Sequence, residues 1–210
     1  VRRAQRAVRD GDFAGEIAPV TVKSRKGEQT VDRDETPFAV DIEKIPTLKP
    51  VFRKDGTVTA ASSSSISDGA AALVIASEGA ARGRGLRPLA RIVSHASHAQ
   101  APEWFTTAPA PAIQKALDRA GWKPSDVDLY EINEAFAVVT MAAAQDLGLD
   151  MARVNVNGGA CALGHPIGAT GARLVTTLLH ALRRRGLRRG VASQCIGGGE
   201  ATAICIELID

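Results

Sequence analysis

The spacing of apolar residues changes between a helical period and a strand period along the second half of this chain. After Pro111 they recur at every third or fourth position until Gly121, which predicts an amphipathic helix closed by a glycine. Similar patterns predict helices over 134–146 and 169–185. Short apolar runs predict strands over 89–93, 129–132, 154–156, 190–195 and 201–208. Alternating strands and helices from about residue 88 favour a layered α/β domain that ends in a hairpin.

The first 66 residues are less regular. A helix ends near Gly11, the run 17–22 has the composition of a strand, and a charged, loop-rich section with several prolines follows. From Asp68 the composition changes. Residues 69–75 are small and apolar, which predicts a buried strand, and a short helix is expected from Ser77.

Composition and charge narrow the class of protein. Of the 210 residues, 45% are hydrophobic and 23% charged, as in ordinary globular domains. The net charge of +3 predicts neither a nucleic-acid nor a membrane partner, and no run approaches the roughly 20 apolar residues of a membrane span. The basic run 183–189 fits a solvated helix end facing the negative end of the helix dipole better than a site for polyanions.

The cysteines indicate a reducing compartment. Cys161, Cys195 and Cys205 are an odd number, so we expect free thiols in the cytoplasm rather than a disulfide framework. Cys205, on an apolar strand, is expected in the core. Cys161 lies four residues before His165, but two potential ligands without a second pair are weak evidence for zinc, and no metal site is expected. The chain begins without methionine, inside a helical pattern, which suggests a piece of a longer protein.

Cys195 precedes three consecutive glycines inside a strand-like run. A run of glycines weakens a strand and packs nothing, so it indicates that something must approach the backbone closely. A thiol beside bare N–H groups suits carbanion or acyl chemistry at a thioester. The alternative is a cysteine that serves only as a small buried hydrophobic residue.

The loop 157–168 places His165 between a strand and a helix. Its glycines would suit a phosphate, but the spacing matches neither the dinucleotide-binding nor the P-loop pattern. Pro166 restricts the backbone around His165, so we interpret the loop as a rigid holder of an acid/base imidazole. A taut loop around an ordinary buried histidine stays open as the alternative.

Three further polar residues have simple interpretations. Asn133 stands where a strand ends and a helix begins, so it is either an N-cap or an amide placed to hold a water or a carbonyl oxygen. His95 and His98 are most simply surface histidines.

Taken together, segments 133–137, 155–173 and 195–199 resemble signature blocks of the thiolase family, which includes acetyl-CoA acetyltransferases and 3-ketoacyl-CoA thiolases, and 58–73 is similar to a further block. The resemblance implies two similar α/β halves with αβαβα layering and a loop domain inserted in the first. Residues 1–66 would be the end of that loop domain. Residues 67–87 would be the last strand and helix of the N-terminal half, and 88–210 the C-terminal half.

Carried over residue by residue, the resemblance assigns the chemistry. His165 would activate a nucleophilic cysteine of the N-terminal half, a position that none of the three cysteines here occupies. Cys195 would move the proton at the substrate α-carbon. Asn133 and His165 would hold the water of one oxyanion hole, and the backbone N–H of Gly197 would contribute to the other.

The same resemblance assigns the binding of coenzyme A. Ser64 would bond its pantetheine arm, and Phe52, Ala60 and Phe136 would line that channel. Ser62 stands where the family often has asparagine, which alters the loop but not the chemistry.

The activity implied is that of an acyl-CoA acetyltransferase of fatty acid metabolism: Claisen condensation of acetyl-CoA, or thiolytic cleavage of 3-oxoacyl-CoA. Coenzyme A and acetyl-CoA are then substrates, and no cofactor is expected. The implied partners are acyl-CoA substrates and the missing N-terminal half, in a homodimer or homotetramer when complete, and the fragment alone would be inactive. The alternatives are a non-catalytic coenzyme A-binding fragment and one half of a split thiolase.

Overall fold

The computed structural model describes residues 1–25 and 27–209. Its helices are α1 (Arg2–Arg9), α2 (Thr36–Ala39), α3 (Glu78–Gly83), α4 (Pro109–Ala120), α5 (Ala137–Leu147), α6 (Ala160–Leu163) and α7 (Thr170–Arg185). Its strands are β1 (Val20–Ser24), β2 (Gly27–Val31), β3 (Ala90–Ala99), β4 (Leu129–Ile132), β5 (Arg189–Cys195) and β6 (Glu200–Leu208). Short 3₁₀ helices occupy Ile42–Thr47, Ala60–Ser62, Pro102–Thr107, Pro124–Asp126 and Met151–Arg153.

The central sheet has the strand order β3-β6-β5-β4. β6 runs antiparallel to both β3 and β5, whereas β5 and β4 are parallel, with Ile132 beside Ser193. Because the two parallel strands end at the same edge of the sheet, the residues that follow them meet there. Asn133 and Cys195 lie at this edge, which therefore positions the candidate site.

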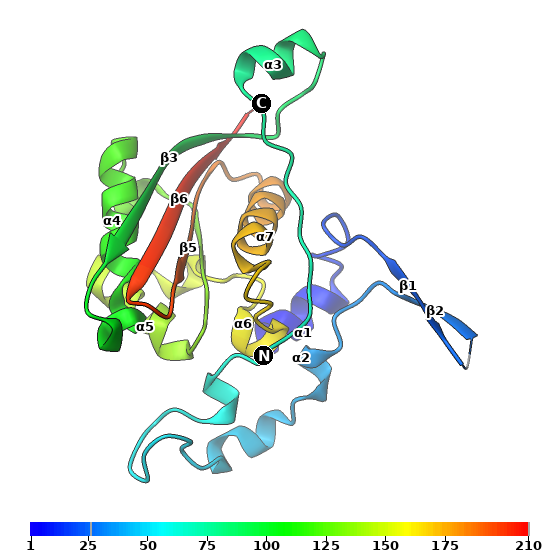
Figure 1. The fold of residues 1–210 in the computed structure, drawn as a ribbon, viewed down its shortest axis with the longest axis vertical. Helices are drawn as coiled ribbons and strands as arrows, with labels where there is room; N and C mark the ends of the chain where they lie inside the picture. Colours follow the sequence, from blue (N-terminus) through cyan, green and yellow to red (C-terminus); the bar gives the residue numbers. More distant parts are fainter. Residues whose placement is uncertain (26, 210) are drawn as a thin grey trace.

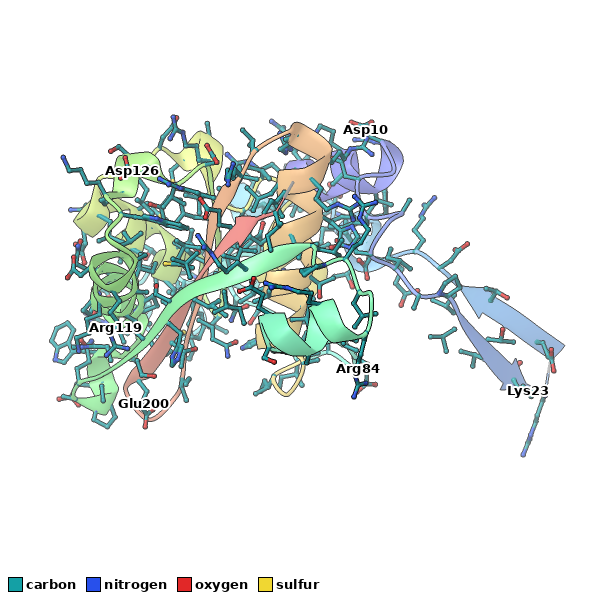
Figure 2. All side chains as sticks on the ribbon, turned by 90° about the horizontal axis from the view of Figure 1, so that it is seen from above. Asp10, Lys23, Arg84, Arg119, Asp126 and Glu200 are labelled. Atoms are coloured by element: carbon teal, nitrogen blue, oxygen red, sulfur yellow. The ribbon has the colours of Figure 1, made fainter. Side chains whose placement is uncertain are left out.

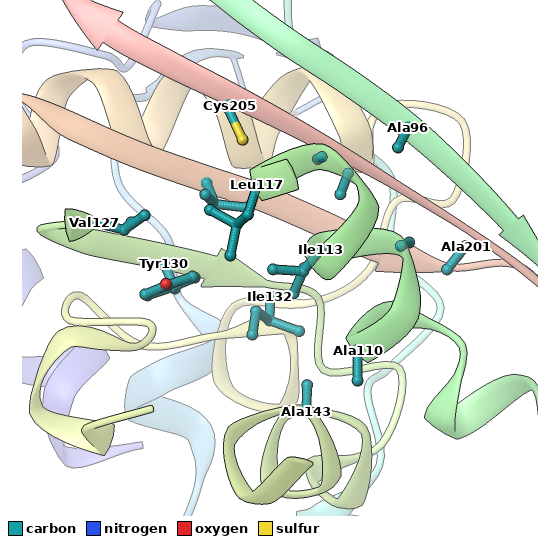
Figure 3. Packing of buried hydrophobic residues seen from close by; sticks show 14 of the residues in the cluster. Ala96, Ala110, Ile113, Leu117, Val127, Tyr130, Ile132, Ala143, Ala201 and Cys205 are labelled. Carbon is teal, nitrogen blue, oxygen red and sulfur yellow. The ribbon is translucent and has the colours of Figure 1, made fainter. Parts of the chain in front are cut away.

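Helices cover both faces of the sheet, with α7 on one side and α4 and α5 on the other (Figures 1 and 2). On the α4 face, Ile113 and Leu117 pack against residues of β4, including Ile132, and all three are fully buried (Figure 3). On the α7 face, Leu178 and Leu182 are equally buried. Each such side chain contributes roughly 1.5–3 kcal/mol through removal of apolar surface from water. The α/β architecture predicted from the sequence is confirmed.

The sequence predicted well the helices that have a periodic apolar pattern and end at a glycine. α4 begins two residues before Pro111 and ends at Gly121, whose φ of 69° is left-handed. α7 ends in the same way at Gly186. The strand 129–132 and the C-terminal hairpin are confirmed, and Cys205 is completely buried in the core as expected (Figure 3). β3 continues to Ala99, well beyond the predicted end of that strand.

Two predicted strands are wrong. Residues 69–75 run extended without a strand partner among the described residues, and Val74 is 95% exposed. Their apolar composition indicates burial, but a strand also needs a neighbour with which to exchange hydrogen bonds. At 154–156 only Val154 forms an isolated bridge, and Asn155 has a φ of 48°. The Asn155 side chain bonds both the N–H and the C=O of Ile132, and so takes the place of a backbone ladder.

The structure also shifts the predicted bounds of one helix and one strand. The helix expected from residue 134 begins at Ala137, because Phe136 is extended. The strand expected at 17–22 lies at 20–24 and pairs with β2 in a hairpin that projects away from the sheet (Figures 1 and 2). The basic run lies at the end of α7, where Arg184 pairs with Asp12 at 2.6 Å. No helix in the described part of the chain is both long and apolar enough to cross a membrane.

Candidate active site

The edge of the sheet brings Asn133 and His165 together. Asn133 follows β4, is fully buried, and its backbone N–H donates to Ser193 C=O at 2.9 Å. Its Nδ2 lies 3.3 Å from His165 Nε2. The N-cap interpretation of Asn133 is therefore wrong: the cap of α5 is Phe136, and the Asn133 amide faces the imidazole.

His165 is fixed from several directions. Its backbone N–H donates to Ser65 C=O at 3.0 Å, and its Nδ1 lies 2.7 Å from Thr170 Oγ1 on the first turn of α7. Burial, and after it the charge of Arg173, lowers the pKa of His165. The imidazole is therefore neutral at pH 7, which is the form that accepts a proton.

A carboxylate of this chain, rather than a phosphate, occupies the glycine loop. Glu134 accepts a hydrogen bond from Cys161 N–H at 3.2 Å, and a Cβ at Gly159 would collide with its carboxylate. A Cβ at Gly164, whose φ is 96°, would collide with Ser67. These glycines therefore permit close packing that fixes the loop before His165. Sequence reasoning missed this role of Glu134, which leaves no local periodic signal.

Cys161 belongs to the same packing. Its thiol donates to Glu134 C=O at 3.6 Å, and burial followed by the Glu134 carboxylate raises its pKa to about 12. The thiol is thus protonated and engaged with the protein. Among residues 1–25 and 27–209, no three His, Cys, Asp or Glu side chains gather in a way that could hold a metal ion.

Cys195 ends β5, the strand beside the one that leads to Asn133. It is 8% exposed and packs in the apolar cluster on the α4 face. Burial raises its pKa to about 11, so the thiol is protonated at neutral pH. The structure places Cys195 at the same sheet edge as His165, but no hydrogen bond joins the two within the described chain.

The turn after Cys195 leaves backbone donors free. It is closed by hydrogen bonds from Ile196 N–H to Glu200 C=O at 2.7 Å and from Gly199 N–H to Ile196 C=O at 3.1 Å. The N–H groups of Gly197 and Gly198 have no acceptor in the part of the chain that is described. Gly197 is exposed, and a Cβ there would meet nothing within 4 Å, so there is open space beside this part of the backbone.

The three glycines of this turn are not equivalent, and a substitution can show it. Gly199 has a φ of 99°, and a Cβ there would collide with Gln100 C=O. We expect Gly199→Ala to lower the free energy of unfolding by about 2–4 kcal/mol, from left-handed backbone strain plus the collision. Gly197→Ala is the matched control and should leave stability nearly unchanged. Urea unfolding of both variants measures this, and equal stabilities would contradict it.

Most residues expected to bind coenzyme A lie together. Ser64 donates through both its backbone N–H and its Oγ to Ala135 C=O, at 3.1 and 3.0 Å. Phe136 meets Phe52 edge to face, with ring centroids 5.8 Å apart, and Phe52 is 72% exposed. Phe105, which sequence reasoning missed, also meets Phe136 edge to face, with ring centroids 6.4 Å apart. Ala60 is exposed at the start of the short helix before Ser64.

The buried carboxyl group of Glu131 lies beside Arg173, the cation whose charge acts on His165. Arg173 Nη1 lies 3.6 Å from Glu131 Oε2, and Glu131 is only 1% exposed. Burial raises the pKa of Glu131 to about 8, against the opposing effect of Arg173. Neither residue was singled out from the sequence, because a contact between a strand and a helix leaves no local pattern.

Comparisons with known proteins identify related sequences. Two family models match: the thiolase N-terminal domain over residues 1–79 and the thiolase C-terminal domain over residues 86–208. The acetyl-CoA acetyltransferase of Shinella zoogloeoides is 52% identical over 206 residues, and that of Escherichia coli K12 is 50% identical over 210. These alignments cover 98% and 100% of this chain but 53% of each relative, so the chain spans about half the length of the curated relatives it matches.

Solved structures give the same result. The Bacillus anthracis acetyl-CoA acetyltransferase matches with a TM-score of 0.95 and 47% identity, over 99% of this chain and 53% of its own. Human mitochondrial 3-ketoacyl-CoA thiolase in complex with CoA matches with a TM-score of 0.90 and 43% identity, over 100% of this chain and 52% of its own.

Proposed function

Since this chain belongs to the thiolase family, we propose that the protein carrying it is an acyl-CoA acetyltransferase that condenses acetyl-CoA or cleaves 3-oxoacyl-CoA with coenzyme A. The observation that carries this proposal is the neutral His165 imidazole, held against the Asn133 amide at the sheet edge where β5 ends in Cys195. Its substrates are coenzyme A thioesters, and the proposal needs no further cofactor.

In condensation, the first chemical step is transfer of the acyl group from coenzyme A to a cysteine, and in cleavage the same step comes last and runs in reverse. His165 Nε2 takes the proton of the nucleophilic thiol, the thiolate attacks the thioester carbonyl, and the carbon–sulfur bond to coenzyme A breaks. The departing thiolate takes the proton back from His165. Cys161 and Cys205 are protonated and packed in the protein, so we propose that the nucleophile comes from polypeptide outside these 210 residues.

The second step makes or breaks the carbon–carbon bond. In condensation the ionised Cys195 sulfur removes a proton from the α-carbon of the second acetyl-CoA, and the resulting enolate attacks the acyl-cysteine carbonyl. The bond from that carbon to the nucleophilic sulfur breaks, and the proton held by Cys195 returns to the released thiolate. In cleavage the nucleophilic thiolate attacks the 3-oxo carbon, the carbon–carbon bond breaks, and the Cys195 thiol gives its proton to the α-carbon of the departing enolate. A thiol whose burial raises its pKa to about 11 is a stronger base, once ionised, than an ordinary cysteine. The free N–H of Gly197 would stabilise the enolate oxygen, and one such donor typically contributes about 10²–10³-fold. The second oxyanion hole would use a water held by Asn133 and His165.

Coenzyme A would bind beside this edge. Ser64 uses its own hydrogen to bond Ala135, so its hydroxyl oxygen is left to accept from an amide N–H of the pantetheine arm. Phe52, Ala60 and Phe136 would line the channel, which is supported by the contact between the two aromatic rings. The solved structure of the human mitochondrial thiolase that contains CoA matches along this whole chain.

The proposal also covers the domain organisation, the assembly and the location of the complete protein. The exposed apolar side chains of Ile66, Val74 and Ile75 support a division in which 67–87 completes an N-terminal thiolase half, before the C-terminal half at 88–210. Residues 1–66 then end a loop domain, and the complete protein forms a homodimer or homotetramer. Free cysteines support a cytoplasmic location.

Thiolysis of acetoacetyl-CoA tests the function. The complete purified protein should consume acetoacetyl-CoA only when coenzyme A is present, whereas residues 1–210 alone should not. A protein that binds coenzyme A without turnover would be the non-catalytic module, and activity that needs a second, separately made chain would show a split enzyme. Turnover by residues 1–210 alone would contradict the assignment of the nucleophile.

A further inference from the structure

The two hydrogen bonds of His165 indicate which ring nitrogen carries the proton. Nε2 faces Asn133 Nδ2, which can only donate. Nδ1 faces Thr170 Oγ1 at 2.7 Å, and that hydroxyl donates its hydrogen to Pro166 C=O at 2.9 Å. A hydroxyl has a single hydrogen, so its oxygen accepts from His165 Nδ1–H. The neutral ring therefore has its proton on Nδ1 and its lone pair on Nε2.

We propose that Thr170 is a positioning residue that holds His165 in the Nδ1–H form, so that Nε2 is the atom that takes the proton of the nucleophile. This rests on the proposed function and names a residue on which its first step depends. The opposite tautomer would present an N–H to the nucleophile and could not accept its proton.

The position of the Thr170 hydroxyl is fixed by burial and by hydrogen bonds. It is completely buried and begins α7, so its hydroxyl has no water with which to exchange partners. Its backbone N–H also donates to Pro166 C=O, at 2.8 Å. Both hydrogen bonds end on the same carbonyl, so the residue after His165 is tied to the first turn of α7 and the hydroxyl is held beside Nδ1.

The charges around His165 favour the neutral imidazole. Only the neutral ring has two tautomers, so the choice between them decides which nitrogen can accept a proton. Arg173, one turn further along α7, lowers the pKa of His165 in addition to the effect of burial. Glu131 of β4 pairs with Arg173 at 3.6 Å. From the N-terminal segment, Glu16 and Asp34 also lie near Arg173, and burial raises the pKa of both carboxyls.

Thr170→Val in the complete protein removes the acceptor at nearly constant volume. We expect kcat for thiolysis to fall about 10- to 100-fold, with KM for the acyl-CoA changed less than about threefold, because the loss falls on proton transfer rather than on binding. In the ¹⁵N spectrum of histidine-labelled protein, His165 should show the Nδ1–H form in the wild type and a mixture in T170V. Thr170→Ser should restore both readouts.

Thr176→Val is the matched control. Thr176 Oγ1 donates to Ala172 C=O at 2.9 Å, as Thr170 does to Pro166, but its contact is with the helix backbone alone. T176V should keep wild-type kinetics and tautomer. Equal loss in T176V and T170V, or no loss in T170V, would overturn the proposal.

The ¹⁵N measurements still decide the question if T170V does not fold or if the complete protein is inactive. If T170V does not fold, the wild-type spectrum still decides, because an Nε2–H form in the wild type overturns the inference. If the complete protein has no thiolase activity, the proposed function fails, while the ¹⁵N tautomers of the wild type, T170V and T170S still confirm or contradict the role of Thr170.

Discussion

His165→Ala should reduce formation of the acyl-enzyme below detection in the complete protein. The imidazole is the group at the sheet edge whose lone pair can take a thiol proton near neutral pH, since burial and Arg173 keep it neutral. Loss of a positioned base typically lowers the rate by about 10²–10⁴-fold, and here every later step depends on the acylation it assists. Incubation with radiolabelled acetyl-CoA, quenching and counting of protein-bound label measures the effect.

His98→Ala controls for the loss of an imidazole as such. The His98 ring bonds Gln100 and Lys115 rather than Asn133 or Thr170, and β6 separates His98 from Cys195 in the sheet. Its removal should therefore leave labelling unchanged. Labelling of the His165 variant at the wild-type rate, with an unchanged far-UV circular dichroism spectrum, would show that another group activates the nucleophile.

Cys195→Ala should separate the two halves of the reaction. The variant keeps His165 and Asn133, so acetyl-CoA should still label it at close to the wild-type rate. Condensation and thiolysis should both fall by about 10²–10⁴-fold, because no sulfur is left to move the α-proton. Exchange of the acetyl-CoA methyl protons with deuterium from solvent, followed by mass spectrometry, should be lost in parallel.

Cys205→Ala is the control for removing a buried thiol from the same hairpin. Cys205 is completely buried on β6, and its register partner on β5 is Val191 rather than a site residue. That variant should lose some stability but keep acylation and proton exchange. Condensation at a normal rate in C195A would refute the assignment of Cys195 as the group that moves the proton.

The sequence predicted those elements that depend on residues close together in the chain. The helices that end at Gly121 and Gly186 follow from apolar periodicity and from glycines that adopt left-handed backbone angles. The hairpin of β5 and β6 follows from two apolar runs around a glycine turn. The glycines beside Cys195 and His165 could also be recognised in the sequence, because they lie within a few residues of these side chains.

The tertiary structure decided which side chains meet. Asn133 resembled a helix cap, yet it faces an imidazole 32 positions away, and Glu134 fills a loop that resembled a phosphate site. Asn155 bonds Ile132 where a strand was predicted. Such contacts join residues far apart in the chain, and a hydrogen bond between distant segments imposes no period on the sequence.

The sequence by itself therefore determined the α/β layering and the family resemblance, and it led to the prediction that His165 and Cys195 are the reactive side chains. Only the folded chain showed that His165 Nδ1 lies beside Thr170 Oγ1, that a side chain at position 199 would collide with the Gln100 backbone, and that residues 69–75 lie largely exposed. The reason is physical: composition sets how strongly a segment prefers burial or a helix, whereas the partner that satisfies it is chosen by the packing of the whole chain.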